Sequence, residues 1–124
     1  MIDHVNLQVS DVEASRRFYE PLLVTLGVTV SGDGEGWVGF FFEDDGGSFW
    51  LIPAERAGDR ELHLAFRASD RAQVRDFHAA AIAIGAEILY SPQLFPEYHD
   101  AYFATFVRDP DGHNVEAVCH VAEL

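Results

Sequence analysis

The chain has 124 residues, and its 8 Lys and Arg residues stand against 21 Asp and Glu residues, which gives a formal net charge of −13 at pH 7. This length suits one domain, or two very small modules that share a core. A hydrophobic fraction of 48% indicates a folded globular protein and excludes a disordered acidic tail. A surface with this much negative charge repels phosphate backbones and anionic lipids, and we therefore expect no nucleic-acid or membrane partner. Binding of cationic small molecules is compatible with this charge.

Cysteine usage and the N-terminal residues indicate the cellular compartment. The single cysteine, Cys119, excludes an intramolecular disulfide framework and suits a reducing environment. Residues 1–4 show neither the basic region nor the apolar run of a signal peptide, and no stretch approaches the ~18 apolar residues of a membrane span. We therefore expect a cytoplasmic protein.

An internal repeat divides the chain into halves. Residues 4–11 and 63–70 align at an offset of 59, the separation of His4 from His63. The same register pairs further identical residues: Ser10 with Ser69, Asp11 with Asp70, Arg16 with Arg75, and Phe18 with Phe77. An offset near half the length predicts two copies of one supersecondary unit. We expect a single domain over residues 1–124, with modules at about 1–56 and 60–124 and a linker near 53–60.

The first copy opens with a strand at residues 3–9, where apolar and polar residues alternate. Asp11 is typical of a helix N-cap, and the apolar spacing after it predicts a helix that ends at Gly27 and is kinked or interrupted at Pro21. Three further strands are predicted at 28–31, 37–42 and 48–52, with a hairpin turn at 44–47.

The second copy repeats this order. Asp70 is expected to cap a helix that ends at Gly85 and whose apolar face carries Val74, Phe77, Ala81 and Ile82. Strands follow at 87–90, 102–107 and 113–120, with a loop at 91–100 and a turn at 109–112. Each half therefore has the order βαβββ, which places the protein in the α+β class.

Three residues of the strands could hold a metal ion. His4 and His63 occupy equivalent polar positions of the first strand of each copy, and Glu116 is a carboxylate within an apolar strand. If the copies pack about a pseudo-two-fold axis, the two imidazoles converge, and a buried carboxylate needs a partner or a metal. Two histidines and one carboxylate bind a divalent ion and leave positions open for substrate. Taken singly, a strand histidine is more often satisfied or exposed than a metal ligand, and a glutamate near the end of a chain is usually solvated. The repeat register is what favours His4 and His63 as partners.

The sequence resembles the vicinal oxygen chelate superfamily, the glyoxalase, bleomycin-resistance and extradiol-dioxygenase group. The resemblance covers essentially the whole chain and depends on residues 3–5, 18–27, 63–66 and 109–116, together with the run at 97–107 that precedes the last segment. The segment 109–116, Asp-Pro-Asp-Gly-His-Asn-Val-Glu, is the most specific. The resemblance implies two βαβββ modules that form a cupped mixed β-sheet with the helices on its outer face, and a divalent metal in the concavity. The family's ligand positions match His4, His63 and Glu116.

One feature departs from glyoxalase I. Those enzymes carry a fourth protein ligand, usually Glu, on the fourth strand. Aligning Gly47 with Gly112 places Leu51 opposite Glu116, and a slip of one residue places Trp50 there. Because neither side chain ligates a metal, the site is more similar to the three-ligand sites of extradiol dioxygenases and of thiol transferases of the fosfomycin-resistance kind.

Neighbouring polar and aromatic residues are candidates for further roles. Tyr102, His99 and Tyr98 are the expected hydrogen-bond donors or general acid and base groups, although both tyrosines are equally explained as packing residues. We expect a substrate to contact Trp50, Leu51, Arg67 and Asn6. Arg67 shares the His63 face and could orient an anionic group, or it could be solvated at the strand end.

Two classes of function remain open. The resemblance favours an enzyme that uses one divalent ion (Fe²⁺, Mn²⁺, Zn²⁺ or Ni²⁺) on a small oxygenated substrate, as a lyase, an isomerase or a ring-cleaving dioxygenase. The alternative is a non-catalytic antibiotic-binding protein of the bleomycin-resistance type, which the acidic charge favours and the retained ligand set opposes. A homodimer is expected by resemblance, with sites that could be completed across chains.

Overall fold

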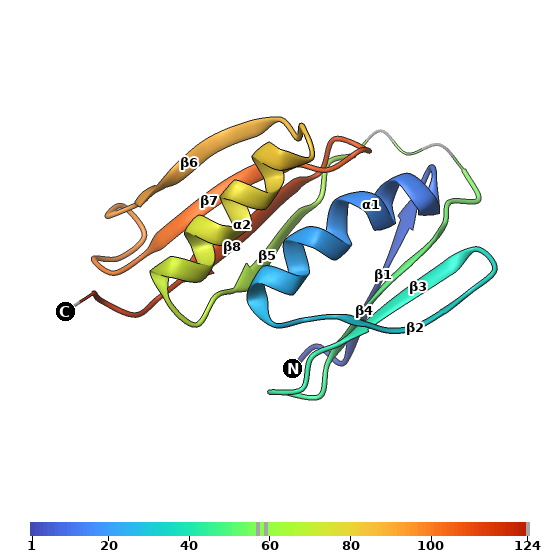
Figure 1. Ribbon diagram of the computed structural model, residues 1–124, viewed down its shortest axis with the longest axis horizontal. Coiled ribbons are helices and arrows are strands. Elements are labelled where there is room, and N and C mark those ends of the chain that lie inside the picture. Colours follow the sequence, from blue (N-terminus) through green and yellow to red (C-terminus); the bar gives the residue numbers. More distant parts are fainter. Residues whose placement is uncertain (57, 59, 124) are drawn as a thin grey trace.

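The computed structural model in Figure 1 describes residues 1–56, 58 and 60–123. The first half comprises β1 (His4–Val9), α1 (Val12–Leu23), the 3-10 helix η1 (Val24–Leu26), β2 (Val30–Gly34), β3 (Trp37–Phe41) and β4 (Ser48–Pro53). The second half comprises β5 (His63–Arg67), α2 (Arg71–Ala83), β6 (Ile88–Leu94), β7 (Phe103–Arg108) and β8 (Asn114–Cys119). The predicted linker lies partly outside the described residues, at 57 and 59.

Each half forms its own four-stranded mixed sheet. The strand order is β1-β4-β3-β2 in the first sheet and β5-β8-β7-β6 in the second. In both, the first strand pairs in parallel with the last, and the other pairings are antiparallel. This identical topology confirms the predicted α+β fold with two βαβββ modules. It also places β1 and β5, which carry His4 and His63, at an edge of two different sheets.

The first helix follows the local signals in the sequence. Asp11 is its N-cap, and the carboxylate accepts a hydrogen bond from the backbone N–H of Ala14 at 3.1 Å. Pro21 lies inside α1, near its C-terminal end, and the chain tightens into η1 directly after Leu23. Gly27 ends η1 with a φ of 81°, a left-handed conformation that glycine adopts without strain.

Two expectations for the second half were wrong in detail. Ile82, expected on the buried face of α2, is 57% exposed, while Val74, Phe77 and Ala81 are buried. The strand expected at 87–90 extends to Leu94 as β6, because residues 91–94 continue to pair with β7 instead of leaving the sheet as a loop. The register shifts along that pairing show that the extension is irregular.

The main hydrophobic core joins the two halves. The helices lie side by side against one face of the sheets (Figure 1). Buried side chains from both modules form one cluster in this core. Leu7 and Val9 of β1 contribute from the first half, and Val115 and Ala117 of β8 contribute from the second. The opposite faces of the sheets, which carry the polar residues of β1 and β5, stay outside this core.

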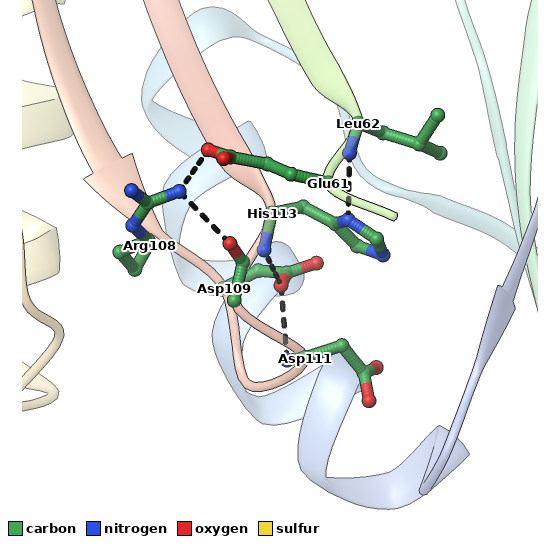
Figure 2. Close-up of polar contacts among 7 residues, drawn as sticks. Glu61, Leu62, Arg108, Asp109, Asp111 and His113 are labelled. Atoms are coloured by element: carbon green, nitrogen blue, oxygen red, sulfur yellow. Dashed lines mark hydrogen bonds and ion pairs between the residues drawn. The ribbon is translucent and has the colours of Figure 1, made fainter. Parts of the chain in front are cut away.

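A polar junction at the β7–β8 turn links the modules further. The buried Asp109 accepts hydrogen bonds from the backbone N–H groups of Asp111 at 2.9 Å and His113 at 2.8 Å (Figure 2), and from the Tyr19 hydroxyl of α1 at 2.5 Å. His113 Nδ1 accepts from the backbone N–H of Leu62 at 3.0 Å. The turn therefore fixes both α1 and the entry into β5, one residue before His63.

No helix in the part of the chain that the structure describes has both the length and the apolar character required to cross a membrane.

Candidate functional site

The chemistry-bearing residues lie on the sheet faces that the helices leave uncovered. On β5, His63, Ala65 and Arg67 are exposed, while the residues between them pack against the core. Across the ladder, Ala65 pairs with Glu116 of β8, and Glu116 pairs with Phe106 of β7. Strand alternation therefore gathers an imidazole, a carboxylate and an aromatic ring on one face of the second sheet.

The centre of this face is a hydrogen-bonded triad. His63 Nε2 lies 2.7 Å from Oε1 of Glu116, and the Tyr102 hydroxyl donates to Oε2 of the same carboxylate. Glu116 is only 1% exposed, whereas the His63 side chain is 52% exposed. A carboxylate removed from water is costly unless it is paired, and here each of its oxygens has a polar partner.

The Tyr102 hydroxyl of this triad has a raised pKa. Burial first, and then the hydrogen bond to Glu116, raises the pKa of Tyr102 well above that of an ordinary phenol. At neutral pH the Tyr102 hydroxyl is therefore a donor, and its proton points at the carboxylate. This hydrogen bond restricts the orientation of the Glu116 side chain.

His4 lies apart from this triad. Its Nδ1 atom is 2.7 Å from the Asp3 carboxylate, and both side chains are largely exposed. Among the described residues, no group of three or more His, Cys, Asp or Glu side chains is arranged to hold a metal ion. The convergence of His4 with His63 and Glu116 within one chain is therefore not observed, because β1 and β5 belong to separate sheets.

An aromatic layer covers the rest of the second sheet's open face. Phe95 packs on Phe106 with ring centroids 5.1 Å apart, and Tyr98 and Tyr102 are 4.9 Å apart. The buried side chains beneath this layer are Ala104, Phe106 and Val118. The segment between β6 and β7 thus encloses Glu116 from one side, and Tyr98 remains 63% exposed at the rim.

His99 forms a pair that the sequence did not predict. Its Nδ1 atom accepts from the backbone N–H of Ala101 at 3.1 Å, so Nε2 carries the proton and donates to His120 Nδ1 at 2.8 Å. The two rings stack with centroids 5.1 Å apart, and His120 also packs against the edge of Tyr102. His120 directly follows β8, four positions beyond Glu116. This closeness in sequence to Glu116 was the only signal in the sequence that His120 could lie near the triad.

The four residues expected to contact a substrate are placed differently. Asn6 and Trp50 are register partners on the open face of the first sheet. Leu51 is fully buried and packs in the main core, because it points to the helix side of β4, so it offers no surface to a ligand. Arg67 is exposed at the end of β5, where it pairs in register with Val118.

Two clefts of the molecule lie away from the triad. A cleft of about 880 Å³ separates α1 from the β7–β8 turn on the helix side, lined in part by Arg17 and Arg108. A second, of about 580 Å³, lies between β1 and the linker and includes Asn6 and His113. Neither is lined by His63 or Glu116. The triad therefore lies outside both clefts, and His63 is its most exposed side chain.

Most of the chain matches the model of a known protein family. The profile of the Glyoxalase/Bleomycin resistance protein/Dioxygenase superfamily matches residues 1–117. The chain belongs to this superfamily. An uncharacterized protein of Bacillus subtilis (strain 168), YqjT, is 32% identical over 127 aligned positions, which cover 93% of this chain and 95% of that protein.

Solved structures of the superfamily share the fold. A glyoxalase/bleomycin resistance protein from Albidiferax ferrireducens T118 is 28% identical, with a TM-score of 0.80 over 96% of this chain and 98% of that one. A lactoylglutathione lyase from Agrobacterium tumefaciens has a TM-score of 0.70 over 96% and 92% of the two chains, and at 20% identity it shows the fold alone. Superfamily membership therefore rests on nearly the whole chain.

Proposed function

We propose that the protein is a divalent-metal-dependent enzyme that acts on a small oxygenated substrate, as a lyase, an isomerase or a ring-cleaving dioxygenase. The observation that carries the proposal is the pairing of Glu116 with His63 on an open sheet face. Superfamily membership supports the same reading, since the superfamily's name includes glyoxalases and dioxygenases.

The donor atoms of this pair suit a metal ion. His63 Nε2 and Glu116 Oε1 are hydrogen-bonding partners 2.7 Å apart. Both are atoms that a divalent ion accepts as ligands once the proton between them is lost and the two atoms separate. Imidazole nitrogen and carboxylate oxygen are ligands of Zn²⁺, Fe²⁺, Mn²⁺ and Ni²⁺. One chain offers two ligands in this arrangement, and a three-ligand site needs one more.

We propose that His4 of a second chain supplies the third ligand. His4 lies on the open face of the first sheet, on an edge strand, and is accessible. If the first sheet of one chain faces the second sheet of its partner, a homodimer contains two complete His4, His63 and Glu116 sets. In this arrangement the three predicted ligands bind the same ion although they come from two different chains.

Other residues of the chain would orient the metal ligands and contact the substrate. A bound divalent ion supplies Lewis-acid stabilisation to paired substrate oxygens. Tyr102 keeps its proton at Oη and holds Glu116 in one orientation. Both ring nitrogens of His99 are occupied by Ala101 and His120, so His99 would reach a substrate only by exchanging its bond to His120. The Tyr98 hydroxyl stands exposed at the rim and would be the nearer hydrogen-bonding group for a substrate. The aromatic layer excludes water from one side of the carboxylate.

Metal reconstitution tests this proposal. Metal-free protein is incubated separately with Fe²⁺, Mn²⁺, Ni²⁺ or Zn²⁺ under anaerobic conditions, and bound metal is measured by mass spectrometry. We expect about one ion per chain, as a single 2-His-1-carboxylate site requires. His63→Ala and Glu116→Gln should each abolish binding, while the matched controls His78→Ala on α2 and Glu97→Gln should bind as the wild type does. Failure to bind any of the four ions would refute the proposal.

The identity of the bound metal and a screen of substrates then distinguish the possible types of reaction. Preference for Fe²⁺ or Mn²⁺ with dioxygen uptake on catechols supports ring cleavage, whereas Zn²⁺ or Ni²⁺ with turnover of a hemithioacetal supports lyase or isomerase chemistry. Metal binding without turnover of diols, catechols or hemithioacetals would favour the second candidate, a small-molecule binding protein. The net charge of −13 is the observation that favours that candidate, because an acidic surface concentrates cationic ligands.

A further inference from the structure

Two arginines converge at the start of α2. Arg71 is the first residue of that helix, and Arg75 follows one turn later. The guanidinium carbon of each lies 5.0 Å from the centroid of the Phe103 ring of β7. Phe103 is 7% exposed and belongs to a buried cluster with Val74 of α2, on the helix side of the second sheet. The ring therefore holds two positive charges in one place, and we call Arg71 and Arg75 the arginine pair.

The helix places these two charges unfavourably. Like charges four positions apart on a helix repel each other, and the N-terminal end of a helix is the end at which cations are least favoured. Asp70, the residue before Arg71, is the N-cap, and its carboxylate accepts a hydrogen bond from the backbone N–H of Gln73 at 2.8 Å. The arginine pair therefore has an electrostatic cost that a partner from outside the helix offsets.

Glu123 is the carboxylate that contacts the arginine pair within the described part of the chain. Its Oε2 lies 3.5 Å from Nη1 of Arg71, and its Oε1 lies 3.8 Å from Nη1 of Arg75. Both distances exceed the roughly 2.7–2.9 Å of a charge-assisted hydrogen bond, so Glu123 satisfies neither guanidinium fully. Its side chain is 57% exposed and lies in the segment after β8, outside any helix or strand, near the first turn of α2 (Figure 1).

The arginine pair also has hydrogen-bonding capacity that is not used. The Arg71 side chain is 16% exposed, and its Nε atom is buried without a hydrogen-bond partner among the described residues. A buried donor without an acceptor is unfavourable. The Arg75 side chain is 52% exposed, so the pair can be reached from solvent. The site thus combines one largely buried guanidinium with one accessible guanidinium.

Charge balance indicates which ligand fits this site. The two guanidiniums carry two positive charges, and the Glu123 carboxylate supplies one negative charge. A dianionic phosphoryl group neutralises both guanidiniums, and its oxygens accept the bidentate hydrogen bonds that guanidiniums donate. The net charge of −13 opposes general binding of anions, so this protein holds an anion only where local groups select it.

We propose that Arg71 and Arg75 form a binding site for a phosphoryl group, either free phosphate or the phosphate of a small monoester, and that Glu123 occupies this site until the anion displaces it. The site lies on the helix side of the second sheet, whereas His63 and Glu116 meet on the open face. It goes beyond the proposed function and does not depend on a bound metal.

Calorimetry with metal-free full-length protein tests the site. Inorganic phosphate, phenyl phosphate and acetate are titrated separately at about pH 8, where phosphoryl groups are mostly dianionic, and at constant ionic strength. We expect one saturable phosphoryl site per chain, with a Kd at least about tenfold lower than that of acetate. Tighter binding of phenyl phosphate supports a monoester as the ligand, and tighter binding of inorganic phosphate supports the free ion. No saturable binding, or equal affinities for acetate and phosphate, would overturn the proposal.

Variants matched in charge identify the residues of the site. Arg75→Gln should weaken phosphate binding about tenfold, whereas Arg17→Gln removes the same charge from the exposed surface of α1 and should bind as the wild type does. Glu123→Gln removes the competing carboxylate and should tighten binding about threefold, while Glu97→Gln changes the net charge equally and should not. Equal affinities of Arg75→Gln and Arg17→Gln, or a Glu123→Gln variant that binds no more tightly than the wild type, would contradict the site.

A further variant separates this site from the proposed metal site. His63→Ala/Glu116→Gln should lose metal binding and keep the phosphate affinity of the wild type, because the two sites lie on opposite faces of the second sheet. Loss of phosphate binding in this variant, with a native circular dichroism spectrum, would show that phosphate binds on the open face and would overturn the proposal.

Discussion

His63 Nε2 and Glu116 Oε1 are 2.7 Å apart, and this contact joins a half-exposed imidazole to a carboxylate that is 1% exposed. The pair is held in one place by two adjacent parallel strands, since His63 and Glu116 lie on β5 and β8. This strand pairing places the carboxylate beside the imidazole.

The first prediction concerns the stability of the metal-free protein. His63→Ala removes one partner of the buried Glu116 carboxylate and should lower the free energy of unfolding by about 1–3 kcal/mol. In the double variant His63→Ala/Glu116→Gln no buried charge is left unpaired, so the loss should be smaller than the sum of the two single losses. Urea denaturation measures all three, and His4→Ala, on an exposed residue, is the control expected to change little. Additive losses would contradict the coupling.

The second prediction concerns the hydroxyl that orients Glu116. Tyr102→Phe removes the donor to Oε2 and should weaken metal binding about 10–100-fold, which is typical when a ligand loses its supporting hydrogen bond. Tyr98→Phe is the matched control, because the Tyr98 hydroxyl makes no side-chain hydrogen bond within the described residues. Competition with a metal-sensitive chelating dye measures both affinities. Equal affinities for the two variants would remove Tyr102 from the site.

The third prediction concerns the junction between the modules. Burial, and then the charge of Asp109, raises the pKa of Tyr19 well above its ordinary value. Near pH 8 native and unfolded chains both keep the phenolic proton, and the hydrogen bond to Asp109 contributes about 1.5–3 kcal/mol. Above about pH 10 the unfolded chain loses that proton while the native state keeps it, so this contribution falls as the pH rises.

Tyr19→Phe isolates the effect of this hydroxyl from the other tyrosines. The difference in free energy of unfolding between wild type and Tyr19→Phe should be largest at about pH 8 and should shrink toward about pH 11. Urea denaturation at a series of pH values measures it. A difference that stays constant or grows with pH would show that the hydroxyl is not held by Asp109.

Much of the fold could be predicted from local signals. The repeat at His4 and His63 and the caps at Asp11 and Asp70 predicted the two modules and their helices, because caps and alternation are short-range patterns. The extension of β6 to Leu94 depended on pairing with β7, which a strand's own composition does not specify. Ile82 was misplaced because helical spacing alone does not tell which edge of the apolar face is covered.

The candidate site was predictable only in part. The alternation of β5 and β8 was enough to predict that His63 and Glu116 share a face, and the structure brings them together. Whether His4 joins them depends on how two sheets are placed relative to one another, which no local pattern encodes. The contacts of Tyr19 with Asp109 and of His99 with His120 are long-range pairs of the same kind, and no motif indicated them.

The proposal that the metal site is shared between chains is tested most directly by complementation between two variants that each lack metal binding. His4→Ala and His63→Ala/Glu116→Gln are prepared separately, refolded together, and the mixed dimer is purified by two different affinity tags and analysed for metal. If the ligands come from different chains, the mixed dimer contains one complete site and should bind one ion, although neither parent binds any. A mixed dimer without metal, alongside a wild type that binds it, would contradict a site shared between chains.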